Sequence, residues 1–229
     1  MAIKMVNLSG NPFIGVFCRI IGDVLICPVD TTDEFMVDIK EGLGLKVHRT
    51  SAGNTNLHGS LVAANSKGLI APYFYSEKEI ERTVIEGDAD LESDLRVVIS
   101  DDPITAWGNN LLLSERYALV NPDLTRDSIK LVENTFDVEV VKGTIAGIKT
   151  IGSIAAMNSK GMVVHPRASE KDLEALKELF SVDVNISTAN FGSPYLGASI
   201  IANDRGALVG SKSSGVELNR IENSLDIID

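Results

Sequence analysis

A segment of about 45 residues recurs five times along this chain, and this repetition constrains the fold more than any other feature. The clearest copies are GSLVAANSKGLIAP (59–72), GSIAAMNSKGMVVHP (152–166) and GASIIANDRGALVG (197–210). Two weaker copies are GVFCRIIGDVLICP (15–28) and GNNLLLSERYALVNP (108–122). Self-similarity at a fixed period of this size indicates repeated copies of one supersecondary unit that pack on their neighbours.

Each copy begins at a glycine, and these leading glycines keep the register along all 229 residues. They stand at positions 15, 59, 108, 152 and 197, so the successive steps are 44, 49, 44 and 45 residues. The long step coincides with EGDADLESD (86–94), a polar stretch typical of a surface insertion. We therefore expect one domain over residues 1–229, divided into units at about 1–44, 45–94, 95–137, 138–181 and 182–229.

Within each unit the pattern predicts three strands and a helix. A short alternating segment such as KVHRT or LRVVIS precedes the glycine, and two apolar runs split by Asn-Ser-Lys-Gly or a relative follow it as a hairpin. Apolar stripes at helical spacing come next, as in Leu173, Leu176 and Phe180. Capping boxes predict the helix starts at Thr31 and Glu34, Ser76 and Glu79, Ser169 and Asp172, and Ser214 and Glu217.

The end units favour a closed ring over an open solenoid. Solenoids need polar terminal repeats, whereas the first and last units here are as apolar as the others. We therefore expect an α/β (α+β) fold, a five-fold pseudosymmetric ring with strands inside and helices outside. Rings of this kind resemble the penteins, a fold family that contains both enzymes and a binding factor. A closed ring leaves no open sheet edge, so we expect a monomer.

Charge and composition limit the classes of partner that the chain can bind and indicate where it is located. The net charge of −11, with only 21 Lys and Arg, argues against DNA or wide phosphate contact and suits a basic protein, although it also fits general solubility or a salty cytoplasm. No apolar stretch is long enough to span a membrane, so we expect a cytoplasmic protein. Cys18 and Cys27 sit in apolar runs typical of buried thiols.

The catalytic signatures of a pentein enzyme are missing. The pentein deiminases and amidinotransferases resemble one another in using a cysteine nucleophile late in the chain, and no cysteine follows Cys27. His48 and His58 lack metal-ligand spacing, and His165 lies in an alternating strand pattern typical of a structural residue. No phosphate-binding or zinc-protease motif occurs. We expect no enzyme activity, cofactor or metal. A guanidino-modifying enzyme or a small-molecule binder in the central cavity is the alternative.

Three longer stretches carry a family resemblance: GTIAGIKTIGSIAAMNSKGMVVHP, STANFGSPYLGASIIANDRGALVG with its SGVEL helix start, and NPFIGVFC. Together they look like translation initiation factor 6 of the archaeal type, in order and over essentially the full length. The resemblance implies a factor that binds the large (50S) ribosomal subunit and sterically prevents its association with the small (30S) subunit. It also implies contact mainly with a basic ribosomal protein near the sarcin–ricin loop, and limited contact with rRNA.

Comparison among the five units points to unit three as the ribosome-binding site. The residues after the leading glycines are Val16, Ser60, Asn109, Ser153 and Ala198, so only unit three carries an amide there, and it alone has a tryptophan. The Gly-Asn at 108–109 matches a contact surface of the family. The alternative is that Asn109 forms a turn and Trp107 fills the core. The predicted site comprises Trp107, Gly108, Asn109 and Asn110, with Ser60, Asn65, Ser66 and Lys67 nearby.

Overall fold

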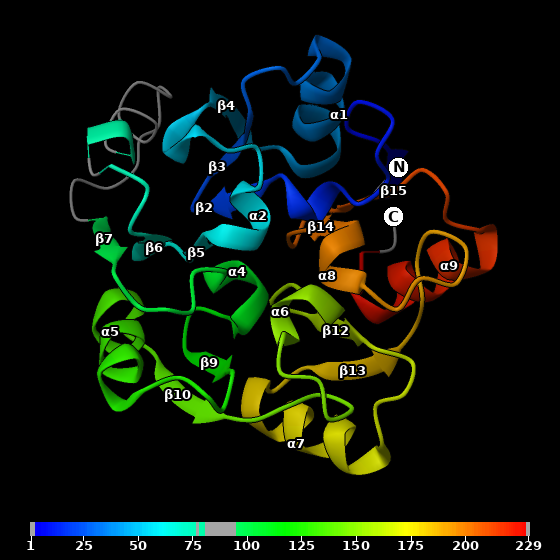
Figure 1. Ribbon diagram of the computed structural model, residues 1–229. Coiled ribbons are helices and arrows are strands. Elements are labelled where there is room, and N and C mark those ends of the chain that lie inside the picture. The colour runs from blue at the N-terminus through cyan, green and yellow to red at the C-terminus, as the bar shows by residue number, and fades with distance from the viewer. Residues whose placement is uncertain (1–2, 77, 81–94, 228–229) are drawn as a thin grey trace.

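Five small sheets surround a common centre in the computed structural model, which describes residues 3–76, 78–80 and 95–227 (Figure 1). Each sheet has three strands within these residues, and helices lie between and around the sheets. The mixed α/β class expected from the sequence is confirmed. The acidic stretch 86–94, expected to be a surface insertion, lies outside the described residues.

One strand topology is common to the sheets. Two strands form an antiparallel hairpin, and a third strand pairs in parallel with the second strand of that hairpin. In the first sheet, Leu25 lies opposite Ile20 in the hairpin and opposite Val47 in the parallel pair. The sheets comprise β2 (Arg19–Ile21), β3 (Val24–Pro28) and β4 (Lys46–Thr50); β5 (Ala63–Ala64), β6 (Gly68–Pro72) and β7 (Arg96–Ser100); β8 (Leu111–Leu113), β9 (Tyr117–Val120) and β10 (Glu139–Lys142); β11 (Ala155–Met157), β12 (Gly161–Val164) and β13 (Asp183–Ile186); and β14 (Ile200–Ala202), β15 (Ala207–Gly210) and β1 (Ile3–Val6).

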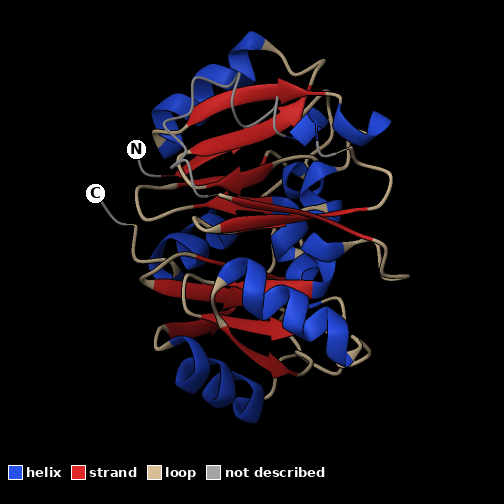
Figure 2. Ribbon diagram, turned by 90° about the vertical axis from the view of Figure 1, so that its left-hand side faces the viewer, coloured by secondary structure: helices blue, strands red, loops and turns tan. Residues whose placement is uncertain are grey.

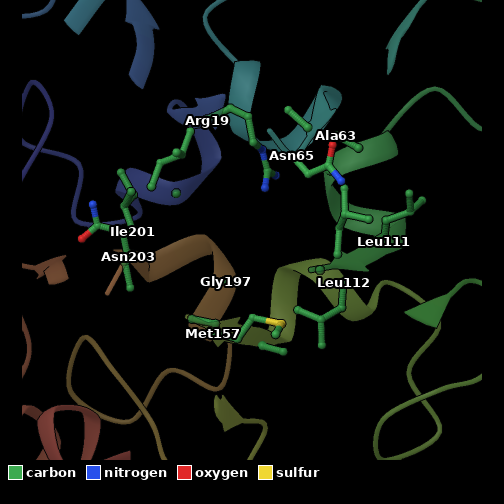
Figure 3. A pocket seen from close by; sticks show the side chains of 18 of the residues that line it. Arg19, Ala63, Asn65, Leu111, Leu112, Met157, Gly197, Ile201 and Asn203 are labelled. Atoms are coloured by element: carbon green, nitrogen blue, oxygen red, sulfur yellow. The ribbon is translucent and has the colours of Figure 1, made fainter. Parts of the chain in front are cut away.

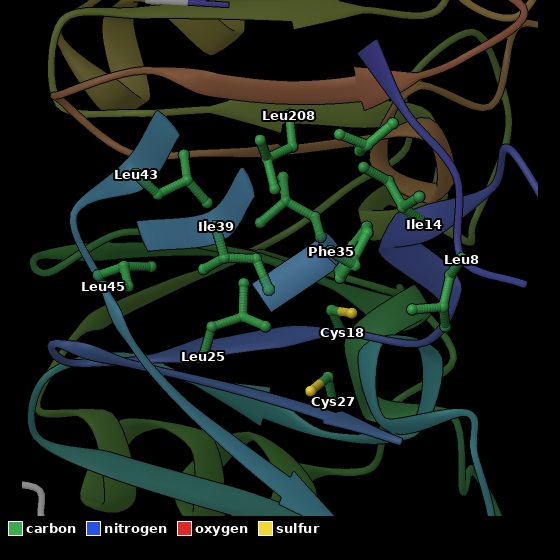
Figure 4. Close-up of a cluster of buried hydrophobic side chains, with 12 residues drawn as sticks. Leu8, Ile14, Cys18, Leu25, Cys27, Phe35, Ile39, Leu43, Leu45 and Leu208 are labelled. Carbon is green, nitrogen blue, oxygen red and sulfur yellow. The ribbon is translucent and has the colours of Figure 1, made fainter. Parts of the chain in front are cut away.

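The fifth sheet brings the two ends of the chain together. Its third strand is β1, which pairs in parallel with β15 so that Ile3 lies opposite Ala207 and Val6 opposite Gly210. The repeat pattern does not predict β1. A core cluster of side chains from both ends supports the same contact: Phe35 and Ile39 of the first unit pack with Leu208 (Figure 4).

The longer helices lie at the periphery of the molecule in Figure 1. Among the described residues they are α1 (Asp33–Leu43), α5 (Arg126–Phe136), α7 (Glu170–Phe180) and α9 (Gly215–Ser224). The stripe predicted on α7 is confirmed, because Leu176 and Phe180 are buried and Leu173 packs against the same cluster. Burying one large apolar side chain of this kind stabilises the fold by roughly 1.5–3 kcal/mol.

Three of the predicted capping boxes are confirmed. The side chains of Ser169 and Ser214 each accept a backbone N–H three residues on, and Asp172 and Glu217 reciprocate. Ser76 and Glu79 exchange the same two hydrogen bonds, both at 3.1 Å.

The capping box predicted at Thr31 and Glu34 is wrong. The N-cap of α1 is Thr32, whose hydroxyl accepts the N–H of Phe35 at 3.3 Å. A capping box at Thr31 would need its backbone N–H for Glu34, but that N–H already donates to the carbonyl of Pro28 at 3.1 Å.

Short helical segments occur at all five leading glycines, where the sequence predicted only the start of a hairpin. They are η1 (Ile14–Val16), α2 (His58–Leu61), α4 (Trp107–Asn110), α6 (Ile151–Ile154) and α8 (Leu196–Ser199). Figure 1 shows α2, α4, α6 and α8 grouped around the centre. Helices are therefore not confined to the outside, as the sequence had suggested.

These short helices contact one another in a closed order, from η1 through α2, α4, α6 and α8 back to η1. The leading glycines make this packing possible. A Cβ on each glycine would collide with the main-chain carbonyl oxygen of the leading glycine one unit earlier, and a Cβ on Gly15 would collide with that of Gly197. Glycine recurs at this position because only a hydrogen fits between the neighbouring backbones.

The strands run across the molecule, with loops at both of their ends (Figure 2). The first strand of each hairpin begins at a short helix and ends at a hairpin turn. We call the side formed by η1, α2, α4, α6 and α8 the short-helix face, and the side formed by the hairpin turns the hairpin face. Because the second and third strands are parallel, the loops that follow the third strands lie on the short-helix face.

Candidate functional site

Two of the four residues predicted in unit three are interior. Trp107 is fully buried in the cluster that contains Val132 and Phe136, and its indole N–H has no acceptor among the described residues. Gly108 is also buried, against the carbonyl of Gly59. Both residues shape α4 rather than face solvent.

Asn110 and Asn109 have different environments. Asn110 is buried; its amide donates to the carbonyl of Ala106 at 2.7 Å and accepts from the Asn121 side chain at 2.7 Å. Asn109 is half-buried, and only its backbone N–H is used, toward Ala106 at 3.1 Å. The Asn109 side chain makes no hydrogen bond to the described part of the chain, so its amide is available to a partner.

Ser60 occupies the position of Asn109 in the neighbouring unit. It is half-buried, and its backbone N–H donates to the carbonyl of Leu57 at 3.1 Å. The side chain of Ser153, at the same position in unit four, instead donates to the carbonyl of Thr150 at 2.6 Å. Ser60 and Asn109 therefore lie on adjacent short helices, α2 and α4, with side chains not committed to the fold.

Asn65 and Lys67 connect units two and three. Asn65 is buried; its amide donates to the carbonyl of Phe136 at 3.1 Å, and its oxygen accepts the N–H groups of Lys67 and Gly68. The ammonium of Lys67 lies 2.8 Å from the carboxylate of Asp137, and this hydrogen bond lowers the pKa of Asp137. Both residues bind the end of α5.

Ser66 joins two hairpin turns. Its backbone N–H and hydroxyl donate to the carboxylate of Glu115 at 3.1 and 2.5 Å. Ser159 makes the same pair of bonds to Asp204, at 2.8 and 2.7 Å. Because this contact recurs between units four and five, it serves the fold in at least two places.

The structure does not bring the whole predicted site together. Ser60 and the α4 residues lie on the short-helix face, whereas Asn65, Ser66 and Lys67 lie on the hairpin face, at the other end of β5. The sequence analysis grouped these residues because they belong to neighbouring units. It did not indicate at which end of the strands each residue would lie.

An exposed aromatic side chain stands on the short-helix face, in the loop between β13 and α8. Phe191 is 85% exposed, and Asn190, Phe191 and Gly192 all have positive φ angles, which is uncommon for the two non-glycine residues. The carboxylate of Glu217 accepts the N–H groups of Phe191 and Gly192, at 3.2 and 2.8 Å, and the hydroxyl of Thr188 at 2.7 Å.

Glu217 lies in α9 rather than in this loop, and the sequence did not reveal its importance for the loop. Desolvation raises the pKa of its carboxyl, but hydrogen bonds from the backbone of Ser214 and Gly192 and from the hydroxyls of Thr188 and Ser214 outweigh it and lower the pKa to about 2. The sequence identified Glu217 only as a capping residue. Its additional role in holding the loop depends on a contact across 25 or more positions.

A central cavity of about 410 Å³ is lined by residues from all five units (Figure 3). Most of its lining side chains are apolar, among them Leu112, Met157 and Ile201. Arg19, from β2, is the cation among its lining residues, and Glu115 lies in the lining on the hairpin face. The sequence analysis did not single out Arg19.

Two histidines have structural partners. His58 is fully buried, with Nδ1 3.0 Å from the Tyr75 hydroxyl and Nε2 3.2 Å from the carbonyl of Thr50; desolvation lowers its pKa. His165 is buried, and its Nδ1 accepts the backbone N–H of Arg167 at 3.1 Å.

Both cysteines are buried and free, as the sequence predicted (Figure 4). Desolvation raises the pKa of Cys18 well above its ordinary value, and raises that of Cys27 to about 11. At neutral pH both are thiols rather than thiolates, and the thiolate is the nucleophilic form. Within the described residues, no helix is long and apolar enough to cross a membrane.

The fold and its two faces define an α/β repeat protein, and comparison with known proteins gives its family. The model of the eIF-6 family matches residues 3–224. Proteins named translation initiation factor 6 are similar over nearly their whole length: 38% identical in Picrophilus torridus (97% of this chain, 99% of the relative), 37% in Methanocaldococcus jannaschii (96% of each) and 34% in Methanosarcina mazei (99% and 100%). The chain belongs to the eIF-6 family of translation initiation factors.

Proposed function

We propose that this protein is a cytoplasmic, non-catalytic factor that binds the large ribosomal subunit and sterically prevents the small subunit from joining it. In this proposal the chain is one monomeric domain, a pentein-type ring with five-fold pseudosymmetry and units near 1–44, 45–94, 95–137, 138–181 and 182–229. The family name supports the role in translation, and the closed order of contacts among the short helices supports the ring.

The main support for the short-helix face as the binding face is the side chain of Asn109, which makes no hydrogen bond within the described part of the chain. It lies on the short-helix face at the one position of the repeat where unit three alone has an amide. Ser60 on the adjacent helix extends the same surface. Trp107, Gly108 and Asn110 contribute by fixing the position of α4, because their own atoms are committed to packing and internal hydrogen bonds.

A basic ribosomal protein is the partner that best fits the charge of the chain. At a net charge of −11, electrostatic attraction favours a positively charged surface and disfavours broad contact with RNA phosphates. Asn65, Ser66 and Lys67 already bind neighbouring parts of the chain, so we propose that the hairpin face has at most a secondary part in the contact.

The state of the cysteines supports binding rather than catalysis. Pentein-type guanidino chemistry needs a reactive thiolate facing the central cavity. Cys18 lines that cavity, but it is 3% exposed and its raised pKa keeps it protonated at neutral pH. We therefore expect no release of ammonia or citrulline from guanidino substrates.

Substitution of Asn109 by Glu tests the proposal. Glutamate at this position has a longer side chain than Asn and lacks the N–H donors of the amide. The change removes no internal hydrogen bond, so the melting temperature should stay within about 2 °C, since surface changes alter stability by about 0.5 kcal/mol or less. Co-sedimentation with purified large subunits should fall at least about tenfold, the loss expected for an interface hot spot.

Asn134→Glu is the matched control, because Asn134 belongs to the same unit but lies exposed on the outer helix α5. It should bind large subunits as the unchanged chain does. Equal binding by all three proteins would exclude Asn109 from the contact surface. Failure of the unchanged chain to bind large subunits would refute the proposed function itself.

A further inference from the structure

Arg19 is the one residue that breaks a layer of apolar side chains in the central cavity. Four residues after each leading glycine, the five units place Arg19, Ala63, Leu112, Ala156 and Ile201, and all five line the cavity. Figure 3 shows Arg19, Ala63, Leu112 and Ile201 around the same opening. Positions equivalent in the repeat are alike unless something requires a difference, so a cation among four apolar neighbours calls for a physical reason.

The guanidinium of Arg19 has no negatively charged partner in the described chain. One of its NH₂ groups donates to the carbonyl of Gly59, and its Nε is buried without an acceptor. Glu115 is the carboxylate that lines the cavity, and both of its oxygens accept hydrogen bonds from Ser66. Burial of an unpaired charge is costly, and an ion of opposite sign recovers part of that cost.

The charge of Arg19 persists under ordinary conditions. Desolvation lowers the pKa of its guanidinium to about 10, which still leaves it protonated at neutral pH. A guanidinium presents its N–H donors in a planar fork that matches the two oxygens of a carboxylate. A half-buried, charged guanidinium whose Nε lacks an acceptor therefore has the properties of an anion-binding group.

We propose that the central cavity binds a small monocarboxylate, with its carboxylate at Arg19 and its aliphatic body against the apolar wall. The volume of about 410 Å³ lies within the range of ligand pockets, about 300–1,000 Å³. Leu112, Met157 and Ile201 form an apolar part of the wall, beside polar residues such as Asn65 and Asn203, and this part favours a hydrocarbon body over a fully polar anion. Glu115 in the lining disfavours a second negative charge. This site is independent of the proposed ribosome contact.

Calorimetric titration with sodium butyrate tests the site, with Arg19→Met as the variant and Arg116→Met as its matched control. Arg116 is exposed on the hairpin turn of the third unit. The unchanged chain and Arg116→Met should bind one butyrate, and Arg19→Met should bind at least about tenfold more weakly, as expected when a charge-assisted hydrogen bond is lost. Sodium chloride and sodium phosphate should compete weakly, because neither offers an apolar body.

A structure of the unchanged chain with butyrate decides the matter even if Arg19→Met does not fold. Electron density for the carboxylate beside the Arg19 guanidinium would support the proposal. Three outcomes would overturn it: no saturable binding by the unchanged chain at about 10 mM butyrate, equal binding by Arg19→Met, or density for butyrate elsewhere with none in the cavity. In those cases Arg19 has only a structural role, through its hydrogen bond from β2 to the carbonyl of Gly59.

Discussion

The side-chain amide of Asn203 donates a hydrogen bond of 2.8 Å to the main-chain carbonyl of Leu43, across 160 positions of the sequence. Asn203 lies in the last hairpin turn, and Leu43 is the last residue of the first long helix. This bond ties the end of the chain to its beginning. Equivalent bonds tie other turns to the helix of the next unit: Asn65 to Phe136 at 3.1 Å and Asn158 to Leu225 at 2.8 Å.

Asn203→Ala should therefore destabilise the protein even though it changes a loop residue. The substitution removes the bond to Leu43 and the two bonds that the Asn203 oxygen accepts from the N–H groups of Arg205 and Gly206. We expect a loss of about 2 kcal/mol in the free energy of unfolding, measured by urea denaturation. Asn185→Ala, at an exposed strand position, is the control and should change it by less than about 0.5 kcal/mol. Equal losses would contradict the connecting role of Asn203.

Gly152→Ala should cost more than an ordinary helix substitution. A Cβ there would collide with the carbonyl oxygens of Gly108 and Leu111, which belong to backbone and cannot move aside easily. We expect a loss of about 3 kcal/mol, at the upper end for overpacking. Gly215→Ala is the control, because a Cβ at Gly215 meets nothing within 4 Å, and it should stabilise α9 slightly. A tolerated Gly152→Ala would refute the close packing of the short helices.

The stability of the loop that carries Phe191 should depend on pH through Glu217. The folded-state pKa of Glu217 is lowered from 4.5 to about 2, so its contribution is fully present above about pH 4.5 and is lost as the pH falls toward 2. Glu217→Gln should weaken the acid-induced fall in the free energy of unfolding within that window. The control, Glu174→Gln on the exposed side of α7, should keep the fall of the unchanged chain. Identical pH profiles for both variants would contradict the role of Glu217 in holding the loop.

Phe191→Ala should leave stability unchanged and weaken binding. The side chain is 85% exposed, so its removal costs little packing, and the backbone of the loop remains held by Glu217. Because we propose the short-helix face as the contact surface, we expect a fall of about tenfold in affinity for large subunits, as for an aromatic hot spot. Val37→Ala, at an exposed apolar position on the outer helix α1, is the control. Unchanged affinity would remove Phe191 from the contact.

The sequence predicted most of the repeated features of the fold, although not the short helices at the leading glycines. Strands, hairpins and stripes recur in several copies, so that chance matches cancel. Alignment of the units could have corrected the helix start predicted at Thr31. Thr32 stands four residues after Pro28, just as the N-cap residue Ser76 stands four residues after Pro72. The same alignment could not have predicted the strand β1, since its partner β15 lies about 200 positions away in the sequence.

The candidate site was less accessible to sequence reasoning. Comparison among units marked unit three as different in sequence, but it did not distinguish the buried Trp107 from the half-buried Asn109. It also grouped residues from opposite faces, because one hairpin strand separates Ser60 from Ser66. Arg19 could have been found by the same comparison, applied four residues after the glycine rather than one.

Joining of purified archaeal ribosomal subunits, followed in a sucrose gradient, tests the central claim most directly. With the unchanged chain added before mixing, we predict that the joined ribosome peak falls, that free 30S and 50S subunits accumulate, and that the chain migrates with the 50S peak. The Asn109→Glu variant should leave joining largely intact. Migration of the chain with 30S subunits, or a joined peak of normal size with the unchanged chain bound to 50S, would contradict the account.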